Sequence, residues 1–140
     1  MDVNFGNDLK ELMWIARRAD SMKLTTDLNA KNIPQYNNHF DYVSTPEDGN
    51  NMFSNFSIYE KSTLILDNFD PQFFNMYLPH KNHKKSPSTG IYIYNYAEKP
   101  NEEQPSGYYS GTHDITLKGN LNDTTYGQLY IIAYGVCYNI

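Results

Sequence analysis

The segment Ile91–Ala97 constrains the fold more than any other part of the sequence, because tyrosines occupy every second position in it. Successive side chains of a β-strand point to opposite faces. One face then carries Ile91, Ile93 and Ala97, and the other carries Tyr92, Tyr94 and Tyr96. Gly90 precedes the segment and Pro100 follows it, and both residue types favour turns. We therefore predict a strand over Ile91–Ala97.

Composition extends this prediction to the whole chain. The 140 residues include 13 tyrosines, and aromatic residues make up 15% of the chain, whereas disordered chains contain few aromatics. Tyrosine and threonine favour strands, and asparagine and serine favour turns. We expect one all-β domain over residues 1–140, rich in loops. The formal net charge of −5 argues against direct binding of nucleic acid.

Three further segments are predicted as strands: Ser62–Asp67, His113–Lys118 and Gln128–Tyr138. The last is apolar or aromatic on both faces, which predicts a central strand covered on both sides. Polar stretches rich in asparagine, glycine or proline are predicted as loops: residues 29–38, 45–55, 79–89 and 100–111.

The segment Asp8–Arg17 fits two structures. As a helix it would begin with Asp8 and Glu11 in a capping-box arrangement, and an apolar face would follow. As a strand it would place Leu12, Trp14 and Ala16 on one face. Periodicity alone slightly favours the helix.

No pattern in the sequence specifies catalysis. The basic cluster His80–Lys85 is expected to be a solvated loop rather than a phosphate-binding or nuclear-import segment, since no aromatic residues interleave with it. His80 and His83 have ligand-like spacing without complementary ligands, and Glu102-Glu103 is expected to be a solvated turn. Cys137 is expected to be a core or interface residue. We predict no enzyme activity, cofactor or metal.

Two asparagines, Asn55 and Asn122, fit the N-glycosylation sequon. The sequon indicates glycosylation only for a protein that enters the secretory pathway. No signal peptide begins the sequence, and no stretch approaches 18 consecutive apolar residues, so we predict no transmembrane segment.

The stretch from Pro87 to Gly107 resembles a segment of the major capsid proteins of nucleocytoplasmic large DNA viruses, the iridovirus, phycodnavirus and mimivirus-like group. In that family a strand of the form G-I-x-x-Y-x-[FY]-A runs into K-P-x-E-x-Q-P-S-G. The residues that carry the match are Gly90, Ile91, Tyr92, Tyr94, Tyr96, Ala97, Pro100, Gln104, Pro105, Ser106 and Gly107. Leu9–Ile15 resembles the family's V-K-E-L-I-W-V strand, and Tyr130–Ile140 resembles its last strand.

The resemblance implies a jelly-roll β-sandwich, the C-terminal roll of a double jelly-roll protein, incomplete on its N-terminal side. It changes the expectation for Asp8–Arg17 to a strand. It also implies a structural role in an icosahedral capsid, built from homotrimeric pseudo-hexameric capsomers. Expected partners are further copies, neighbouring or minor capsid proteins and a separate chain with the N-terminal roll. The expected location is the virion, assembled in a cytoplasmic virus factory.

In this interpretation the glycines and prolines of the motif shape turns. The tyrosines Tyr92, Tyr94 and Tyr96 form either a ladder packed within the sandwich or a contact face. Two other functions stay open at this point. They are a carbohydrate-binding β-sandwich, and an assembly scaffold that is absent from the mature virion.

Overall fold

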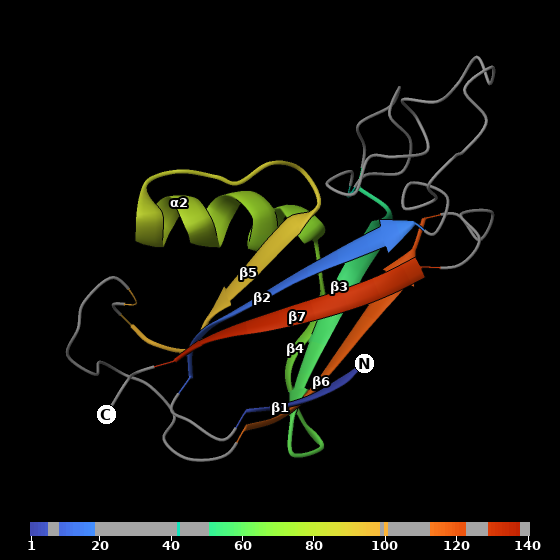
Figure 1. The fold of residues 1–140 in the computed structure, drawn as a ribbon, viewed down its shortest axis with the longest axis vertical. Coiled ribbons are helices and arrows are strands. Elements are labelled where there is room, and N and C mark those ends of the chain that lie inside the picture. The colour runs from blue at the N-terminus through green and yellow to red at the C-terminus, as the bar shows by residue number, and fades with distance from the viewer. Residues whose placement is uncertain are drawn as a thin grey trace, which may run out of the picture.

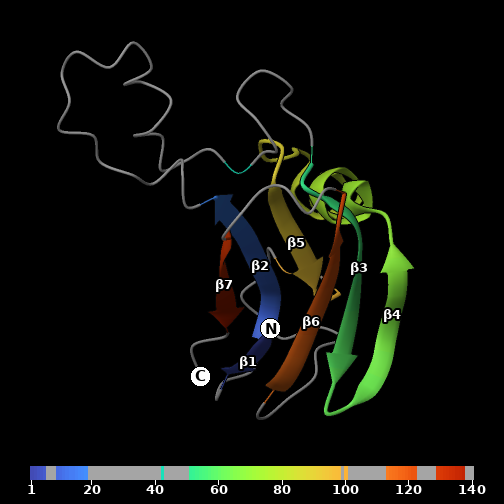
Figure 2. The ribbon, with the colours of Figure 1, turned by 90° about the vertical axis from the view of Figure 1, so that its right-hand side faces the viewer.

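The computed structural model describes residues 1–5, 9–18, 42, 51–98, 100, 113–122 and 129–137. Within these ranges two antiparallel sheets pack face to face, and a helical segment lies at one side (Figures 1 and 2). The four-stranded sheet has the order β1 (Asp2–Phe5), β6 (His113–Leu121), β3 (Phe53–Glu60) and β4 (Thr63–Phe69). The three-stranded sheet has the order β5 (Ile91–Asn95), β2 (Leu9–Arg18) and β7 (Leu129–Cys137).

An aromatic cluster lies in the core between the sheets. Trp14 on β2 is 1% exposed and stacks on Tyr92 of β5, with ring centroids 5.8 Å apart. Phe56 of β3 meets both rings from the opposite sheet, 5.4 Å from Trp14 and 4.7 Å from Tyr92. Aromatic pairs at these separations add stability beyond the area that they bury. This cluster therefore joins the two sheets.

The ambiguous N-terminal segment is a strand, as the family resemblance implied. β2 lies in the middle of its sheet, and Trp14 pairs with Tyr92 on one side and with Ala133 of β7 on the other. Pairing on both edges outweighs the local preference for a helix.

The expectation that the C-terminal strand is central was wrong. Among the described strands β7 pairs only with β2, at the edge of the three-stranded sheet. Its residues Tyr130, Ile131, Tyr134 and Val136 are 40–49% exposed. Both faces of the strand are apolar because one packs on the core while the other carries apolar side chains outward.

The expectation of a loop over residues 79–89 was wrong in its first part. A π-helical turn, η2 (Phe73–Tyr77), continues into α2 (Leu78–His83), so part of the basic cluster is helical. Phe74 of η2 is fully buried against Trp14, with ring centroids 5.2 Å apart. Pro79 stands in the first turn of α2, where a proline does not interrupt helical hydrogen bonds.

Two strands were not predicted, β1 and β3. The segment Phe53–Glu60 lacks clean alternation because the register of β3 shifts three times. One shift lies between Phe53 and Asn55 against β6, and two lie between Phe56 and Tyr59 against β4. A bulge breaks the period of two that reveals a strand in the sequence. β3 begins at Phe53, so the last three residues of the predicted loop over residues 45–55 belong to a strand; residues 45–50 of that prediction lie outside the described residues.

Candidate interaction surface

The three-stranded sheet turns an apolar face away from the core. Trp14 points into the core, so its neighbours on β2 point outward. Register extends this face over all three strands, because paired residues share a face: Met13 lies between Ile93 and Tyr134, and Ile15 lies between Ile91 and Ile132. With Val136, which pairs with Glu11, these residues form what we call the apolar outer face: Met13, Ile15, Ile91, Ile93, Ile132, Tyr134 and Val136.

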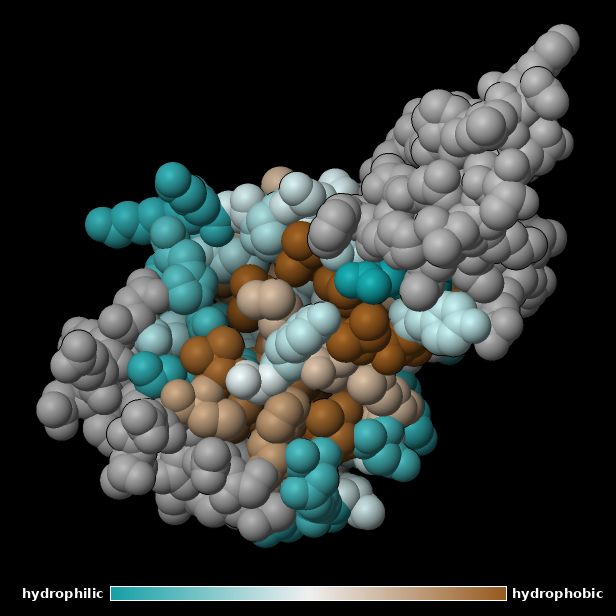
Figure 3. Space-filling view, viewed as in Figure 1, coloured by the Kyte–Doolittle hydropathy of each residue, from teal (hydrophilic) through white to brown (hydrophobic). Residues whose placement is uncertain are grey.

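The apolar outer face is separate from the core between the sheets. Ile15 and Ile93 are buried, 5% and 7% exposed, yet neither belongs to the hydrophobic cluster between the sheets. Tyr134 and Val136 are the most exposed members, at 49% and 43%. Figure 3 shows apolar residues gathered over β5, β2 and β7 on the side of the molecule that faces the viewer. Large contiguous apolar patches on a soluble protein commonly mark interaction sites.

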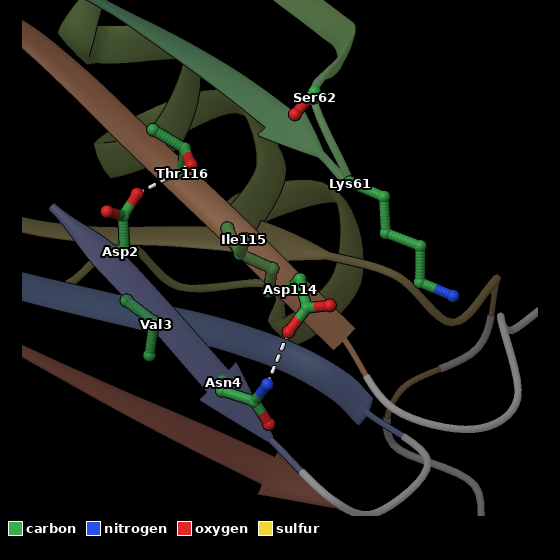
Figure 4. A pocket seen from close by; sticks show the side chains of 8 residues that line it. All are labelled: Asp2, Val3, Asn4, Lys61, Ser62, Asp114, Ile115 and Thr116. Carbon is green, nitrogen blue, oxygen red and sulfur yellow. Dashed lines mark hydrogen bonds between the residues drawn. The ribbon is translucent and has the colours of Figure 1, made fainter.

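The opposite sheet provides an internal comparison, because its outer face is polar over β1, β6 and β3. Asp2 accepts a hydrogen bond from Thr116 at 2.7 Å, and Asn4 donates to Asp114 (Figure 4). These groups line an open hollow of about 670 Å³ together with Lys61. Further along, Asn120 donates to Asn55 at 2.7 Å, and Lys118 lies over the ring of Tyr59 at 4.7 Å. The polar side chains of this face suit exposure to solvent, as is common for one face of an antiparallel sheet.

Part of the motif that carries the family resemblance lies at the apolar outer face, since Ile91 belongs to both. Gly90 immediately precedes β5 and has a φ of 93°, and a Cβ there would lie 2.4 Å from the carbonyl oxygen of Tyr42. Only glycine fits such a close approach in this conformation. Ala97 and Pro100 are buried after the end of β5. Gln104, Pro105, Ser106 and Gly107 lie outside the described residues.

The three motif tyrosines pack within the sandwich. Tyr92 is 1% exposed, and its hydroxyl donates to Asn51 Oδ1 at 2.8 Å. Tyr94 and Tyr96 are half-buried, with ring centroids 4.9 Å apart. Burial raises the pKa of Tyr92 above its ordinary value of 10.0. Burial also raises the pKa of Tyr96, and the charge of Glu60 adds to that effect.

The residues singled out for other chemistry are dispersed. His83 hydrogen-bonds the buried Glu11, so it ties α2 to β2. Cys137 is half-buried and packs against the core. Asn122 donates to the carbonyl oxygens of Asn51 and Phe53, and glycosylation of Asn122 and Asn55 stays a prediction. Glu102-Glu103 lies outside the described residues.

Neither a metal cluster nor a membrane span is found in the part of the chain that the structure describes. Those residues include no group of three or more histidine, cysteine, aspartate or glutamate side chains placed to hold a metal ion. They also include no helix that is long and apolar enough to cross a bilayer.

Comparison with known proteins gives the family. Residues 1–132 match the family described as the large eukaryotic DNA virus major capsid protein. This chain belongs to that family. A major capsid protein of Chrysochromulina ericina virus is 34% identical over an alignment of 73 residues, and the match covers 49% of this chain and 12% of that protein. The recognition made from the Tyr-rich motif is thereby confirmed.

Solved capsid structures share the fold of this family member. A capsid chain in the quasi-atomic model of the PBCV-1 virus capsid superposes with a TM-score of 0.59 at 16% identity, over 96% of this chain and 42% of that one. The Faustovirus major capsid protein superposes with a TM-score of 0.63 at 10% identity, over 99% of this chain and 31% of that one. The all-β jelly-roll prediction is confirmed. The chain spans less than half the length of these relatives.

The apolar outer face was missed at the level of sequence. The signal for it was the doubly apolar character of Gln128–Tyr138, which was interpreted as burial on both sides. That pattern is the same whether the second face is covered within the domain or by another protein.

Proposed function

We propose that this capsid-family chain is a structural, non-catalytic subunit of the shell of a large DNA virus, and that copies associate through the apolar outer face. The observation that carries the proposal is the contrast between the two sheets. One sheet is polar outside over β1, β6 and β3, and the other presents Met13, Tyr134 and Val136 outside. Exposed apolar side chains gathered on one outer face are typical of a surface that another molecule covers.

Charge favours contact between copies at this face. The chain carries a formal net charge of −5, so two copies repel each other over most approaches. On the apolar outer face Glu11, in the row of Val136, is buried and bonded to His83 and Asn95. The exposed members Tyr134 and Val136 are uncharged, so this face adds little repulsion between two copies.

The size of the face sets the strength of the contact. Three strands about 4.8 Å apart and three to four outward positions about 6.8 Å apart span at most roughly 300 Å² on each partner, and Ile15 and Ile93 within that area are already buried. A pair would therefore bury less than roughly 600 Å², below the roughly 1,200 Å² of a stable complex. A single contact of this size is weak, and many simultaneous contacts stabilise an assembled shell.

Family membership supports the finer parts of the proposal. They are homotrimeric pseudo-hexameric capsomers, contacts with minor capsid proteins, a separate chain for the N-terminal roll, and assembly in the cytoplasm of the host cell. The domain would be the C-terminal roll, lacking its first strands. Family membership does not favour the carbohydrate-binding or scaffold alternatives.

Sedimentation velocity over a concentration series up to about 1 mM, the weak end of measurable affinity, tests the proposal. We expect the wild-type chain to associate and the double variant Tyr134→Ser, Val136→Thr to stay monomeric. Leu64→Ser is the matched control, because Leu64 is 46% exposed on the other sheet, and it should associate like the wild type. A wild-type chain that stays monomeric throughout would refute self-association. If the double variant still associates, self-association stands but the apolar outer face is not the contact surface.

A further inference from the structure

A groove of about 450 Å³ lies on the outward side of the helical segment formed by η2 and α2. One wall is the helical segment, and the other is the chain that returns after Lys84, where Ser86 Oγ donates to the carbonyl oxygen of Met76 at 3.4 Å. The apolar lining of the groove comes from η2 and the basic lining from α2: Phe73, Met76, Tyr77, His80 and Lys81.

The apolar part of the groove is exposed, and its aromatic rings are already packed together. Met76 is 51% exposed and Tyr77 is 57% exposed, although Phe74 in the same turn is fully buried. The ring of Tyr77 stacks on that of Phe73, with centroids 5.5 Å apart and planes 16° from parallel. Rigid aromatic rings lose little entropy on binding, and covering exposed apolar side chains is favourable. These residues therefore suit an apolar side chain of a binding partner.

The basic part of the groove belongs to a long stretch of the chain without acidic residues. No aspartate or glutamate occurs between Asp70 and Glu98, and the stretch contains three lysines, Lys81, Lys84 and Lys85. None of the three forms an ion pair with a carboxylate in the part of the chain that the structure describes. Hydrophilic side chains project from the molecule in Figure 3 where Figure 1 shows α2. The helix dipole stabilises cations at the end of α2, but it does not account for the exposed apolar side chains beside them.

From the exposed apolar groove and the lysines at its end, we propose that this surface binds an acidic peptide segment of another protein, with an apolar side chain a few residues away from its carboxylates. The apolar side chain lies against Met76 and Tyr77, and the carboxylates pair with the three lysines. At about 1.5 Å per residue, Lys81 and Lys84 lie about 6 Å and about 10 Å beyond Tyr77 along the helix axis. An extended peptide spans that distance in about two to three residues.

Three peptides separate the apolar part of this surface from the basic part. They are acetyl-Ser-Leu-Ser-Glu-Glu-Glu-amide, the same peptide with serine in place of leucine, and the same peptide with glutamine in place of each glutamate. In ¹H–¹⁵N spectra of the labelled chain, we expect the first peptide to shift the backbone amides of Met76, Tyr77 and Lys81. Serine in place of leucine should weaken binding about tenfold, as for a leucine that is incompletely buried.

The charge on the peptide should contribute a smaller and salt-dependent share. Glutamine in place of glutamate should weaken binding about threefold, because exposed ion pairs are individually weak. Raising the ionic strength from about 0.1 M to about 1 M shortens the Debye length from about 10 Å to about 3 Å. The first peptide should then bind no tighter than the glutamine peptide.

Two variants at exposed residues test the assignment within the chain. Met76→Ser should reduce the preference for the leucine peptide over the serine peptide, and Lys81→Gln should reduce the preference for glutamate over glutamine. The matched controls lie on the four-stranded sheet at exposed residues, and both Leu64→Ser and Lys118→Gln should bind the three peptides like the wild type.

Absence of shifts with the first peptide would overturn the proposal. Equal affinities for the leucine and serine peptides would overturn the role of the groove, and equal affinities for the glutamate and glutamine peptides would overturn the role of the lysines. Tighter binding of oligothymidylate at the same amides would assign the surface to nucleic acid instead. Shifts of these amides when the unliganded protein is concentrated would assign it to a second copy of this chain.

Discussion

Replacing Phe56 with alanine tests whether the aromatic cluster holds the two sheets together. Phe56 is 2% exposed, and its ring contacts Trp14 and Tyr92 of the opposite sheet and Phe74 of η2, at centroid distances of 4.7–5.9 Å. Removing a buried phenylalanine ring costs its transfer free energy and leaves a cavity. We expect Phe56→Ala to lower the free energy of unfolding by roughly 3–5 kcal/mol.

That loss is large against the whole stability of a domain, which is typically about 5–15 kcal/mol. At about 2 kcal/mol per molar urea, the midpoint of unfolding should fall by about 2 M. Urea titration followed by circular dichroism and by the fluorescence of Trp14 measures this shift with one global and one local probe. Leu64→Ala, on the same sheet and 46% exposed, should change the stability by less than about 0.5 kcal/mol. A loss from Phe56→Ala no greater than from Leu64→Ala would refute the cluster as the link between the sheets.

Two further predictions concern local features. Because burial raises the pKa of Tyr92, the folded state holds the phenolic proton more tightly than the unfolded state, so stability is complete below about pH 10 and declines above it. Urea midpoints measured from pH 8 to pH 11 should show this decline, and Tyr92→Phe should make it shallower. Lys84 ends α2 with a φ of 58°, and its N–H donates to the carbonyl oxygen of His80 at 2.9 Å. Lys84→Gly should raise the free energy of unfolding by about 1 kcal/mol, since glycine adopts this conformation without strain. Lys84→Ala should give no such gain, because alanine carries a Cβ as lysine does.

Strands with clean alternation could be predicted from the sequence, and those with irregular register could not. Ile91–Ala97 alternates without a break, and β5 accordingly covers Ile91–Asn95. β3 contains Phe53, Phe56 and Ile58, all buried, but bulges separate them by uneven steps. Alternation of apolar and polar residues predicts a strand only where successive side chains point to opposite faces, and a bulge interrupts that alternation.

The edge position of β7 was unpredictable for a different reason. Apolar residues on both faces require that both faces be covered, but not that the same chain cover them. Leu129, Ala133 and Cys137 pack on the core, and Tyr134 and Val136 point outward. The sequence therefore predicted that both faces of this strand are apolar, but not what covers the second face. The helical segment over η2 and α2 was not predicted because α2 is rich in polar and basic residues. It is held by the buried Phe74 and Pro79 and by Asn75, whose side chain donates to the carbonyl oxygens of Ser88 and Ile91.

The distribution of aliphatic residues links the fold to assembly. Among the isoleucines that the structure describes, Ile58 and Ile115 belong to the core cluster, whereas Ile15, Ile91, Ile93 and Ile132 lie on the apolar outer face. The core cluster combines aromatic rings with aliphatic side chains such as Leu9, Leu12 and Leu117. On the apolar outer face Ile15 and Ile93 are already buried, whereas Tyr134 and Val136 stay exposed. Exposed apolar side chains in one patch lower solubility unless they are covered, which supports the proposed contact between copies at this face.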